Sequence, residues 1–407
     1  MSKLETLIQQ LCPEGVEYKP LSELFDTRNG YTPSKGNLEF WTNGTIPWFR
    51  MEDIRENGRI LSKATQYVSR SAVKGDLFPE NSIIVATSAT IGEHALITVP
   101  SLANQRFTYL MLKDQYKDCF SAKFLYYYCF KLDDYCKACL NQGNFASVDM
   151  KKFAKFEFPM VPLEIQREIV RILDNFTELT EKLIAELTAR KKQFQFYHKQ
   201  FFEFKKSDCI QIVCIKDICE LLTGYPFDSS QFTATGIHLL RGMNIKRGIL
   251  DYSESNNRYW NSVQGYEKFL LSTDDIVIAM DGSLVGKSYA QVKSNHLPSL
   301  LVQRVTRVRV TKANAHYIYH YISSGAFTRY VEKKKTGGAV PHISLKDIAN
   351  FKIPLPSENM QKEIADSLDR FDALCNDLTS GLPAEIAARQ KQYEYYRDKL
   401  LTFKKRS

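Results

Sequence analysis

The chain has 407 residues, of which 44% are hydrophobic and 25% are charged, and its net charge is +9. This is the composition of a soluble globular protein with two or three domains, and its mildly basic charge permits nucleic-acid binding without establishing it. No apolar run approaches the roughly 18 residues of a membrane span, and the N-terminus lacks the apolar core of a signal peptide. We therefore expect a cytoplasmic protein with no membrane association.

The nine cysteines are an odd number and show no disulfide framework, which fits a reduced, cytosolic chain. Cys136 and Cys139 form a single C-x-x-C pair. A structural zinc needs four ligands, and no second pair follows at a matching spacing. We therefore predict buried thiols at this place, with no metal and no other cofactor.

The first half mixes short strands with polar loops. Residues 1–25 predict a short amphipathic helix followed by a turn. Strands are predicted within 82–92, where a buried run enters a turn, and at 106–113. Residues 121–141 predict a helix, and its three consecutive tyrosines, which start at Tyr126, are expected in the core.

A long helix is predicted next, because apolar residues recur mostly at steps of three and four from Ile165 to Phe201. Forty-odd residues at 1.5 Å each would form a rod of roughly 60 Å. Such a rod cannot bury its apolar stripe alone, so it needs a partner helix.

The second half repeats this order. The strand and turn at 275–286 match 82–92, the strand at 301–310 matches 103–112, and 315–334 predicts the equivalent helix. A second rod follows, and "QKEIADSLDRFDAL" (361–374) in it matches "QREIVRILDNFTEL" in the first. The two rods are natural partners, and a pseudo-two-fold relation between the halves would place them antiparallel.

The second rod has four more residues than the first between its two matched blocks, from Leu374 to Leu382. Four residues are close to one helical turn, so the apolar face stays in phase. Gly381 and Pro383 stand at this place. Because glycine ends helices and proline begins them, we predict a break that the first rod lacks.

Together these features resemble the specificity subunit of type I restriction-modification systems. The resemblance covers nearly the whole chain. It is carried by "LCPEGVEYKPLSEL" near the N-terminus, by the helix starts "PLEIQREI" and "PSENMQKEI", and by the helix ends "ARKKQFQFY" and "ARQKQYEYYRDKLLTF".

The resemblance implies two target-recognition domains, each reading one half of a split target in double-stranded DNA. It also implies helical spacers that set the gap and dock two methyltransferase subunits, with restriction (translocase and nuclease) subunits joining the complex. The resemblance also implies that this chain is not an enzyme and has no catalysis of its own.

The expected fold is α+β, with two duplicated mixed recognition domains separated by two long helices that form an antiparallel coiled coil in a pseudo-two-fold arrangement. We place the first recognition domain at 1–158 and its helical spacer at 159–206. The second recognition domain is expected at 207–356 and the second spacer at 357–407.

Base edges are read by side chains such as arginine, lysine, asparagine and glutamine, so polar loop residues are the candidates for DNA contact. In the first half we select Arg50, Thr87, Ser88, Thr90, Gln105, Gln142 and Asn144. In the second half we select Arg241, Asn244, Asp281, Ser283, Lys287, Gln303 and His342. A basic loop with phosphate contacts is expected at Lys333, Lys334 and Lys335.

Some of these residues recur in both halves. Arg50 matches Arg241, and the pair Gln105-Arg106 matches Gln303-Arg304. Two domains that read different half-sites share structural or phosphate-binding residues more readily than base-reading ones. Positions that differ between the halves are therefore the better candidates for base choice, namely Ser88 against Asp281 and Thr90 against Ser283.

Aromatic residues gather at matching ends of the two rods. A helical seam needs only one face, so some of these rings should be surplus, and surplus aromatics mark protein contacts. We expect the methyltransferase subunits to dock at Phe194, Phe196, Tyr197, Phe201, Tyr393, Tyr395 and Tyr396.

Two other readings compete. A self-contained DNA-modifying enzyme would need a base-gripping polar-Pro-Pro-aromatic tetrapeptide, which the sequence lacks. The segment "GSLVGKS" (282–288) is one residue too short between its glycines for a nucleotide-binding loop, and we predict a turn between paired strands. A coiled-coil scaffold without DNA specificity would not need the two large duplicated units.

Overall fold

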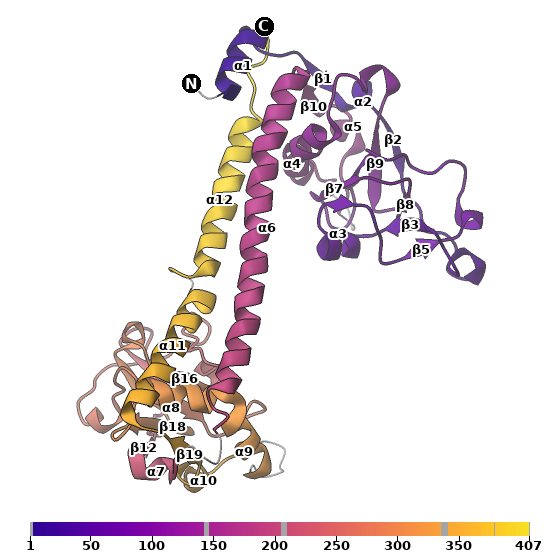
Figure 1. Cartoon of the computed structure of the whole chain (residues 1–407). Coiled ribbons are helices and arrows are strands. Elements are labelled where there is room, and N and C mark those ends of the chain that lie inside the picture. Colours follow the sequence, from indigo (N-terminus) through magenta and orange to yellow (C-terminus); the bar gives the residue numbers. More distant parts are fainter. Residues whose placement is uncertain (1–2, 142–145, 205–209, 335–340, 378, 407) are drawn as a thin grey trace. The chain divides into compact units, whose positions relative to one another are not determined.

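The structure is a computed structural model that describes residues 3–141, 146–204, 210–334, 341–377 and 379–406. It forms two compact units (Figure 1). Unit 1 is Met1–Lys182 with Ile386–Ser407, and unit 2 is Leu183–Glu385.

The helices of unit 1 are α1 (Lys3–Leu11), α2 (Leu21–Leu24), α3 (Met51–Asn57), α4 (Ala122–Ala138) and α5 (Met150–Phe153). Those of unit 2 are α7 (Ile215–Ile218), α8 (Ala315–Tyr321), α9 (Phe327–Lys334), α10 (Leu345–Ala349) and α11 (Glu358–Asn376). Two long helices contribute to both units, namely α6 (Leu163–Gln200) and α12 (Leu382–Leu400).

The strands of unit 1 are β1 (Tyr18–Pro20), β2 (Phe25–Asn29), β3 (Ile46–Phe49), β4 (Ile60–Leu61), β5 (Tyr67–Val68), β6 (Ile83–Ala86), β7 (His94–Ile97), β8 (Leu102–Ala103), β9 (Phe107–Leu112) and β10 (Glu157–Pro159). The strands of unit 2 are β11 (Gln211–Cys214), β12 (Cys219–Thr223), β13 (Ile237–Leu240), β14 (Tyr259–Trp260), β15 (Ile276–Ala279), β16 (Tyr289–Gln291), β17 (Ser299–Leu301), β18 (Val305–Val310) and β19 (Lys352–Leu355).

The sheets of the two units have equivalent strand orders. Unit 1 contains the sheets β2-β9-β6-β7-β4, β5-β3-β8 and β1-β10. Unit 2 contains β12-β18-β15-β16, β14-β13-β17 and β11-β19, and its described residues form no counterpart of the edge strand β4. The central pairs β6-β9 and β15-β18 are both antiparallel, and β3-β8 and β13-β17 are both parallel. The repeat in the sequence is therefore a repeat of topology.

The central strand of unit 1 is buried on both faces. Because side chains alternate along a strand, Ile83 and Val85 pack in a core with α4, whereas Ile84 and Ala86 pack in a second core with β3. In unit 2, β15 divides its side chains in the same way between two cores. A helix thus covers one face of each main sheet, and the small sheet covers the other.

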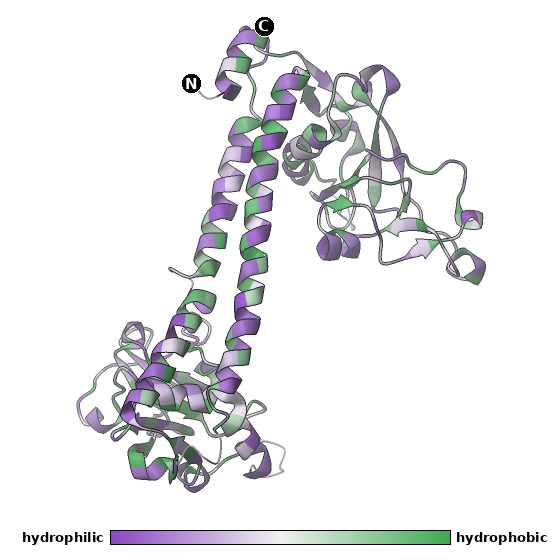
Figure 2. Cartoon of the chain, viewed as in Figure 1, coloured by the Kyte–Doolittle hydropathy of each residue, from purple (hydrophilic) through white to green (hydrophobic). Residues whose placement is uncertain are grey.

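The first rod is confirmed as one helix, α6, whose 38 residues at 1.5 Å each extend about 57 Å. In unit 1 its first half runs antiparallel to α12, and the ring of Phe176 stacks on Tyr396 at 5.6 Å. In unit 2 its second half pairs with α11, where Tyr197 stacks on Phe371 at 5.9 Å. Hydrophobic residues alternate with hydrophilic ones along these helices (Figure 2). The sequence-based fold class is confirmed.

The predicted break in the second rod is confirmed between α11 and α12. Gly381 is required there, because a Cβ atom would lie 2.5 Å from the carbonyl oxygen of Ala373. A second break was not predicted. The helix expected at 315–334 is divided into α8 and α9 by a π-helical segment in which Gly325 has a φ of 84°, a value that glycine adopts without strain.

Several smaller expectations are also met. Cys136 and Cys139 are buried thiols, and the three tyrosines of α4 are buried in the core. The strand expected within 82–92 is confined to β6, and the rest of that segment forms the turn to β7. Across the described part of the chain, no helix has the length and apolar character that crossing a membrane requires.

Candidate nucleic-acid interface

A cavity of about 520 Å³ lies in unit 1, and we name it the basic cavity. It is formed by the loop after β2, by β3 with the start of α3, and by the turn between β8 and β9. Most of its side chains are basic, amide-bearing or aromatic. They are Thr32, Lys35, Leu38, Trp41, Trp48, Arg50, Met51, Glu52, Gln66, Asn104, Gln105 and Arg106.

Two tryptophans form a fixed aromatic wall of this cavity. The rings of Trp41 and Trp48 meet edge to face with centroids 5.0 Å apart. The indole N–H of Trp48 donates to the carbonyl of Tyr31, and that of Trp41 donates to the carbonyl of Ser34, each at 3.0 Å. With both N–H groups bonded to the backbone, the rings offer apolar surface rather than polar donors.

Arg50 and Arg241 hold equivalent local structures. The backbone N–H of Arg50 donates to the Asp53 carboxylate at 2.7 Å, and that of Arg241 donates to the Asn244 side-chain oxygen at 3.1 Å. The Arg50 guanidinium donates to Thr65 at 3.0 Å. The arginine that recurs in both halves therefore has a structural role in each of them.

The environment of Arg241 is more enclosed. Its guanidinium donates to the carbonyl of Asn256 at 2.7 Å, and burial together with nearby Arg258 lowers its pKa. Asn244 is fully buried, and its amide donates to the carbonyls of Asp251 and Asn256. This burial gives Asn244 a structural role in the turn and leaves its side chain no access to solvent.

The turn between β8 and β9 carries Gln105 and Arg106, and both are exposed. Gln105 accepts a hydrogen bond from the hydroxyl of Thr32 across the basic cavity. The equivalent turn between β17 and β18 carries Gln303 and Arg304, which are also exposed. Both turns thus place one amide and one guanidinium at the surface.

The turn after β6 carries three further candidates of the first half. Thr87 is buried, and its hydroxyl bonds that of Thr108 at 2.9 Å. Ser88 and Thr90 are half-buried in the turn. Ser88 and Thr90 are therefore better placed than Thr87 to meet a ligand.

The turn after β15 carries the candidates of the second half. Asp281 accepts a hydrogen bond from the Arg304 guanidinium at 2.8 Å. Ser283 is exposed and Lys287 is half-buried. The segment 282–288 leads into strand β16, whereas a nucleotide-binding loop leads into a helix. The predicted turn between paired strands is confirmed.

The remaining candidates lie near the end of α9. Lys333 and Lys334 are exposed in its last turn. His342 is exposed, and its backbone bridges to that of Asp281. Three candidates lie outside the described residues, namely Gln142, Asn144 and Lys335.

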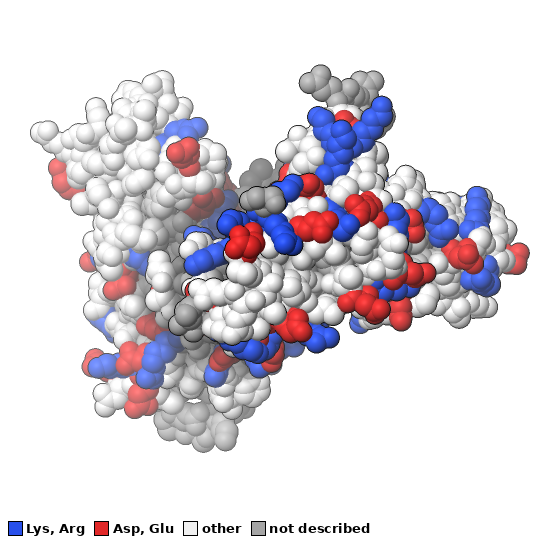
Figure 3. Space-filling model, turned by 90° about the horizontal axis from the view of Figure 1, so that it is seen from above, with Lys and Arg blue, Asp and Glu red and all other residues white. Residues whose placement is uncertain are grey.

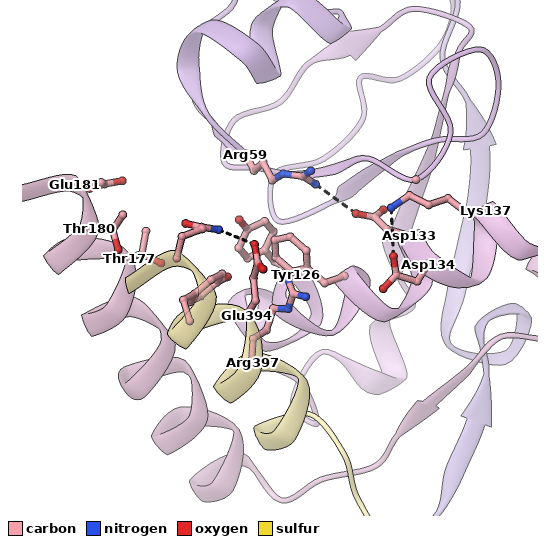
Figure 4. Close-up of a pocket in the computed structure, with 14 residues that line it drawn as sticks. Arg59, Tyr126, Asp133, Asp134, Lys137, Thr177, Thr180, Glu181, Glu394 and Arg397 are labelled. Atoms are coloured by element: carbon pink, nitrogen blue, oxygen red, sulfur yellow. Dashed lines mark hydrogen bonds and ion pairs between the residues drawn. The ribbon is translucent and has the colours of Figure 1, made fainter. Parts of the chain in front are cut away.

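A second cavity, of about 470 Å³, lies in unit 1 between α4, α12 and the first half of α6 (Figure 4). It contains the basic side chains of Arg59, Lys137 and Arg397 and four acidic ones. Arg59 donates to buried Asp133 at 3.3 Å, and Lys137 pairs with Asp134 at 3.2 Å. Its cations are therefore largely neutralised by its own carboxylates.

This contrast identifies the basic cavity as the better candidate for an anionic ligand. It has three basic side chains and one acidic one, whereas acidic side chains outnumber basic ones in the second cavity. On the face that Figure 3 shows, basic and acidic side chains are interspersed. Local concentration of positive charge, rather than the net charge of the chain, therefore marks the site.

Sequence reasoning missed several residues of the basic cavity, including Lys35, Trp41, Gln66 and Arg106. Arg106 could have been selected from the sequence, because it stands beside Gln105 in a pair that recurs in the second half. Lys35 and Gln66 are brought to the cavity only by the fold, from loops that lie far from the turn between β8 and β9 in the sequence. No local pattern distinguishes them from other exposed loop residues.

The aromatic residues at the rod ends divide into two groups. Phe194, Phe201 and Tyr393 pack against the cores of their units, and Tyr197 and Tyr396 form the stacks described above. Two of these seven rings are much more exposed to solvent than the others. Phe196 is 63% exposed and Tyr395 is 62% exposed, and they occupy equivalent positions of the repeat. These two are the surplus aromatics that the sequence predicted.

The family model for the type I restriction modification DNA specificity domain matches the chain twice, at residues 13–189 and 208–388. The chain belongs to this family. Each match covers one copy of the internal repeat, so the duplication seen in the sheets is a duplication of the specificity domain.

Relatives and solved structures agree with this assignment. The chain is 41% identical over 399 residues to the type I restriction enzyme EcoprrI specificity subunit of Escherichia coli, with 93% of each chain covered. It is 37% identical over 252 residues, or 61% of each chain, to the EcoR124I/EcoR124II specificity subunit of the same organism.

The S subunit structure from M. genitalium shares the fold with a TM-score of 0.52 at 16% identity, covering 95% of both chains. The HsdS subunit structure from Thermoanaerobacter tengcongensis shares it with a TM-score of 0.53 at 15% identity, covering 95% of this chain and 96% of that one. At these identities the likeness concerns the fold alone.

Proposed function

We propose that this chain is the DNA specificity subunit of a type I restriction-modification complex. Its two copies of the specificity domain each read one half of a bipartite target in double-stranded DNA. The observation that carries the proposal is the duplication itself, because two equivalent sheets with different loop residues suit two different half-sites. We place the recognition domains at 1–158 and 207–356, and the helical spacers at 159–206 and 357–407.

The basic cavity supports DNA reading by the first domain. Lysine and arginine attract phosphates and the acceptor edge of guanine, whereas glutamine and asparagine match adenine. The cavity offers both kinds of side chain beside a fixed aromatic wall. A coiled-coil scaffold without a DNA role would have no use for this arrangement.

The chain acts without catalysis of its own in this proposal. Two methyltransferase subunits dock on the paired helices, and restriction subunits join the complex. The exposed aromatic pair Phe196 and Tyr395 supports two equivalent docking points, because it recurs once in each copy of the repeat. The assembly works in the cytoplasm.

The test is methylome sequencing of a host that expresses this chain with its methyltransferase subunit, compared with a host lacking this chain. A split motif with a fixed gap, methylated on adenine only when the chain is present, is the expected result. Methylation that does not change when the chain is removed would refute the specificity role. Methylation by the purified chain alone would instead favour a self-contained enzyme.

A further inference from the structure

The turns that carry Arg106 and Arg304 are held in the same way. The carbonyl oxygen of Arg106 accepts the backbone N–H of Thr87 at 3.0 Å, and that of Arg304 accepts the backbone N–H of Met280 at 2.9 Å. Each turn is thereby fixed to the residue that directly follows the central strand of its sheet. The carbonyls of the two arginines therefore make equivalent backbone hydrogen bonds, although Arg304 has a φ of 65° in the left-handed region and Arg106 does not lie in that region.

Their side chains also have different neighbours. The residue after Met280 is Asp281, whose carboxylate accepts from the Arg304 guanidinium at 2.8 Å. The residue after Thr87 is Ser88, which has no carboxylate. Within the described residues, the Arg106 guanidinium makes no hydrogen bond or ion pair with another side chain.

Arg106 is also the least constrained arginine of the basic cavity. Arg50, the other arginine there, donates to Thr65 and lies 3.9 Å from Glu52. Among the described residues, the cavity therefore presents one guanidinium whose donors are not committed to another side chain. Gln105, beside it, already accepts the hydroxyl of Thr32.

We propose that Arg106 reads a guanine in the first half-site, and that Asp281 withholds Arg304 from the same role in the second. The proposal rests on the proposed function of the chain. A guanidinium donates two parallel hydrogen bonds, which match the O6 and N7 acceptors of guanine in the major groove. An uncommitted guanidinium makes both bonds without losing a partner.

Asp281 prevents Arg304 from reading guanine in two ways. It occupies donors of Arg304, and its negative charge repels the acceptor edge of guanine and the neighbouring phosphates. A carboxylate at this place instead suits a donor such as the cytosine N4 amino group. The two copies of the domain thus differ in base preference at equivalent positions through one substitution.

The test uses the complete complex in a host, with the methylated motif as the readout. Arg106→Ala relaxes one guanine position of the first half-site, whereas the gap and the second half-site stay unchanged. Arg106→Lys keeps the charge but loses the paired donors, so it relaxes the same position. Arg304→Ala is the matched control and leaves the first half-site unchanged. An unchanged first half-site in both Arg106 variants would overturn the proposal.

Exchanging the residues at positions 88 and 281 tests the role that we propose for Asp281. Asp281→Ser frees Arg304 and alters one position of the second half-site, and Ser88→Asp engages Arg106 and relaxes the same guanine as Arg106→Ala. If Asp281→Ser leaves the second half-site unchanged in a complex that still methylates, the role of Asp281 is refuted. Thermal unfolding of each variant shows that the fold is retained.

Binding measurements separate base reading from phosphate binding. With duplexes that differ at the guanine position, wild-type complex discriminates by about tenfold or more, and Arg106→Ala loses this discrimination. A phosphate contact would instead weaken binding to every duplex equally and reduce the salt slope by about one, which would overturn the proposal. Failure of the proposed function is distinguishable, since methylation would then not depend on the chain at all.

Discussion

Gln166 and Gln361 perform the same task in the two units. The side-chain oxygen of Gln166 accepts the backbone N–H of Ser121 at 2.8 Å, and that of Gln361 accepts the backbone N–H of Asn314 at 3.0 Å. Both glutamines are buried, and the residues that they bond stand immediately before α4 and α8. Each glutamine thus ties the long-helix pair to the helix that covers the main sheet.

Replacement of either glutamine by leucine is expected to destabilise its unit by about 1–3 kcal/mol, because the partly buried backbone N–H of Ser121 or Asn314 loses its acceptor. Denaturant unfolding measures the loss. Gln195, which is exposed on α6, provides the matched control, and Gln195→Leu should change the free energy of unfolding by less than about 0.5 kcal/mol. Equal effects at Gln166 and Gln195 would contradict the role of the buried amide.

This glutamine pair shows what the sequence could and could not predict. The matched blocks containing Gln166 and Gln361 revealed the repeat, the rods and the break near Gly381, because helical periodicity and turn residues are local signals. The partners Ser121 and Asn314 were not predictable, since each lies some 45 residues away in sequence. The fold class follows from patterns, whereas the contacts that fix it depend on tertiary packing.

The candidate site was predictable to a smaller extent. Gln105 was selected as a polar loop residue of a type that reads base edges, and the fold does place it at the basic cavity. Asn244 was selected for the same kind of reason, but it is buried in the core of its turn. Polar side chains also bond to the backbone of the turns that carry them, and burial separates these residues from those that can face a ligand.

The carboxylates of Asp174 and Asp369 are equivalent in the repeat but have different partners. Asp174 accepts hydrogen bonds from Lys123 and Tyr127, at 2.6 and 2.7 Å. Asp369 forms a hydrogen bond with Nε2 of His320 at 2.7 Å, and its other carboxylate oxygen lies 2.7 Å from Nδ1 of His316 in an ion pair. Although burial opposes it, these two histidines hold the pKa of Asp369 well below its usual range, and the Asp369 carboxylate raises the pKa of His316.

Asp369→Asn is therefore expected to destabilise unit 2 in a pH-dependent way. The pairing of charged His316 with Asp369 contributes fully above the unfolded pKa of aspartate and below that of histidine, which is about pH 4 to 6.5. The contribution is lost as pH rises through the raised pKa of His316. Because both side chains are partly exposed, solvent screening limits the effect to about 1 kcal/mol or less.

Asp174→Asn is the matched control, because lysine and tyrosine do not titrate between pH 5 and about 9. Urea unfolding of both variants at pH 5.5 and at pH 8.5 should show a loss that shrinks with pH for Asp369→Asn and stays constant for Asp174→Asn. Parallel behaviour of the two variants would contradict the charged state of His316.

The pKa of His198 is lowered, unlike that of His316, so His198 should reduce the stability of the fold at acid pH. Burial and nearby His320 lower its pKa to about 4, so the folded chain keeps the His198 ring neutral. The unfolded chain binds a proton at about pH 6.5, and stability therefore falls as the pH drops from 6.5 towards 4. His198→Phe should reduce this acid sensitivity in unfolding measurements. If the free energy of unfolding of His198→Phe falls with pH as steeply as that of the wild type, another group is responsible.

The exposed aromatics Phe196 and Tyr395 predict a partner contact that can be separated from folding. Phe196→Ser with Tyr395→Ser should weaken assembly with the methyltransferase subunits by about tenfold or more, as loss of aromatic anchors does at interfaces. The unfolding midpoint of the isolated chain should not change. Tyr396→Ser removes the stacked partner of Phe176 and should lower that midpoint. Unimpaired assembly in the double variant would refute docking at these rings.

Lengthening the helical spacers tests whether they set the gap in the target. Because α6 is one uninterrupted helix that contributes to both units, four residues added near Leu183, with four added to the second spacer, lengthen the rod by about 6 Å and preserve the apolar face. This corresponds to nearly two base pairs at roughly 3.4 Å per step. Methylome sequencing should show both half-sites unchanged and a longer gap. An altered half-site with the original gap would assign the spacing to the recognition domains instead of the helices.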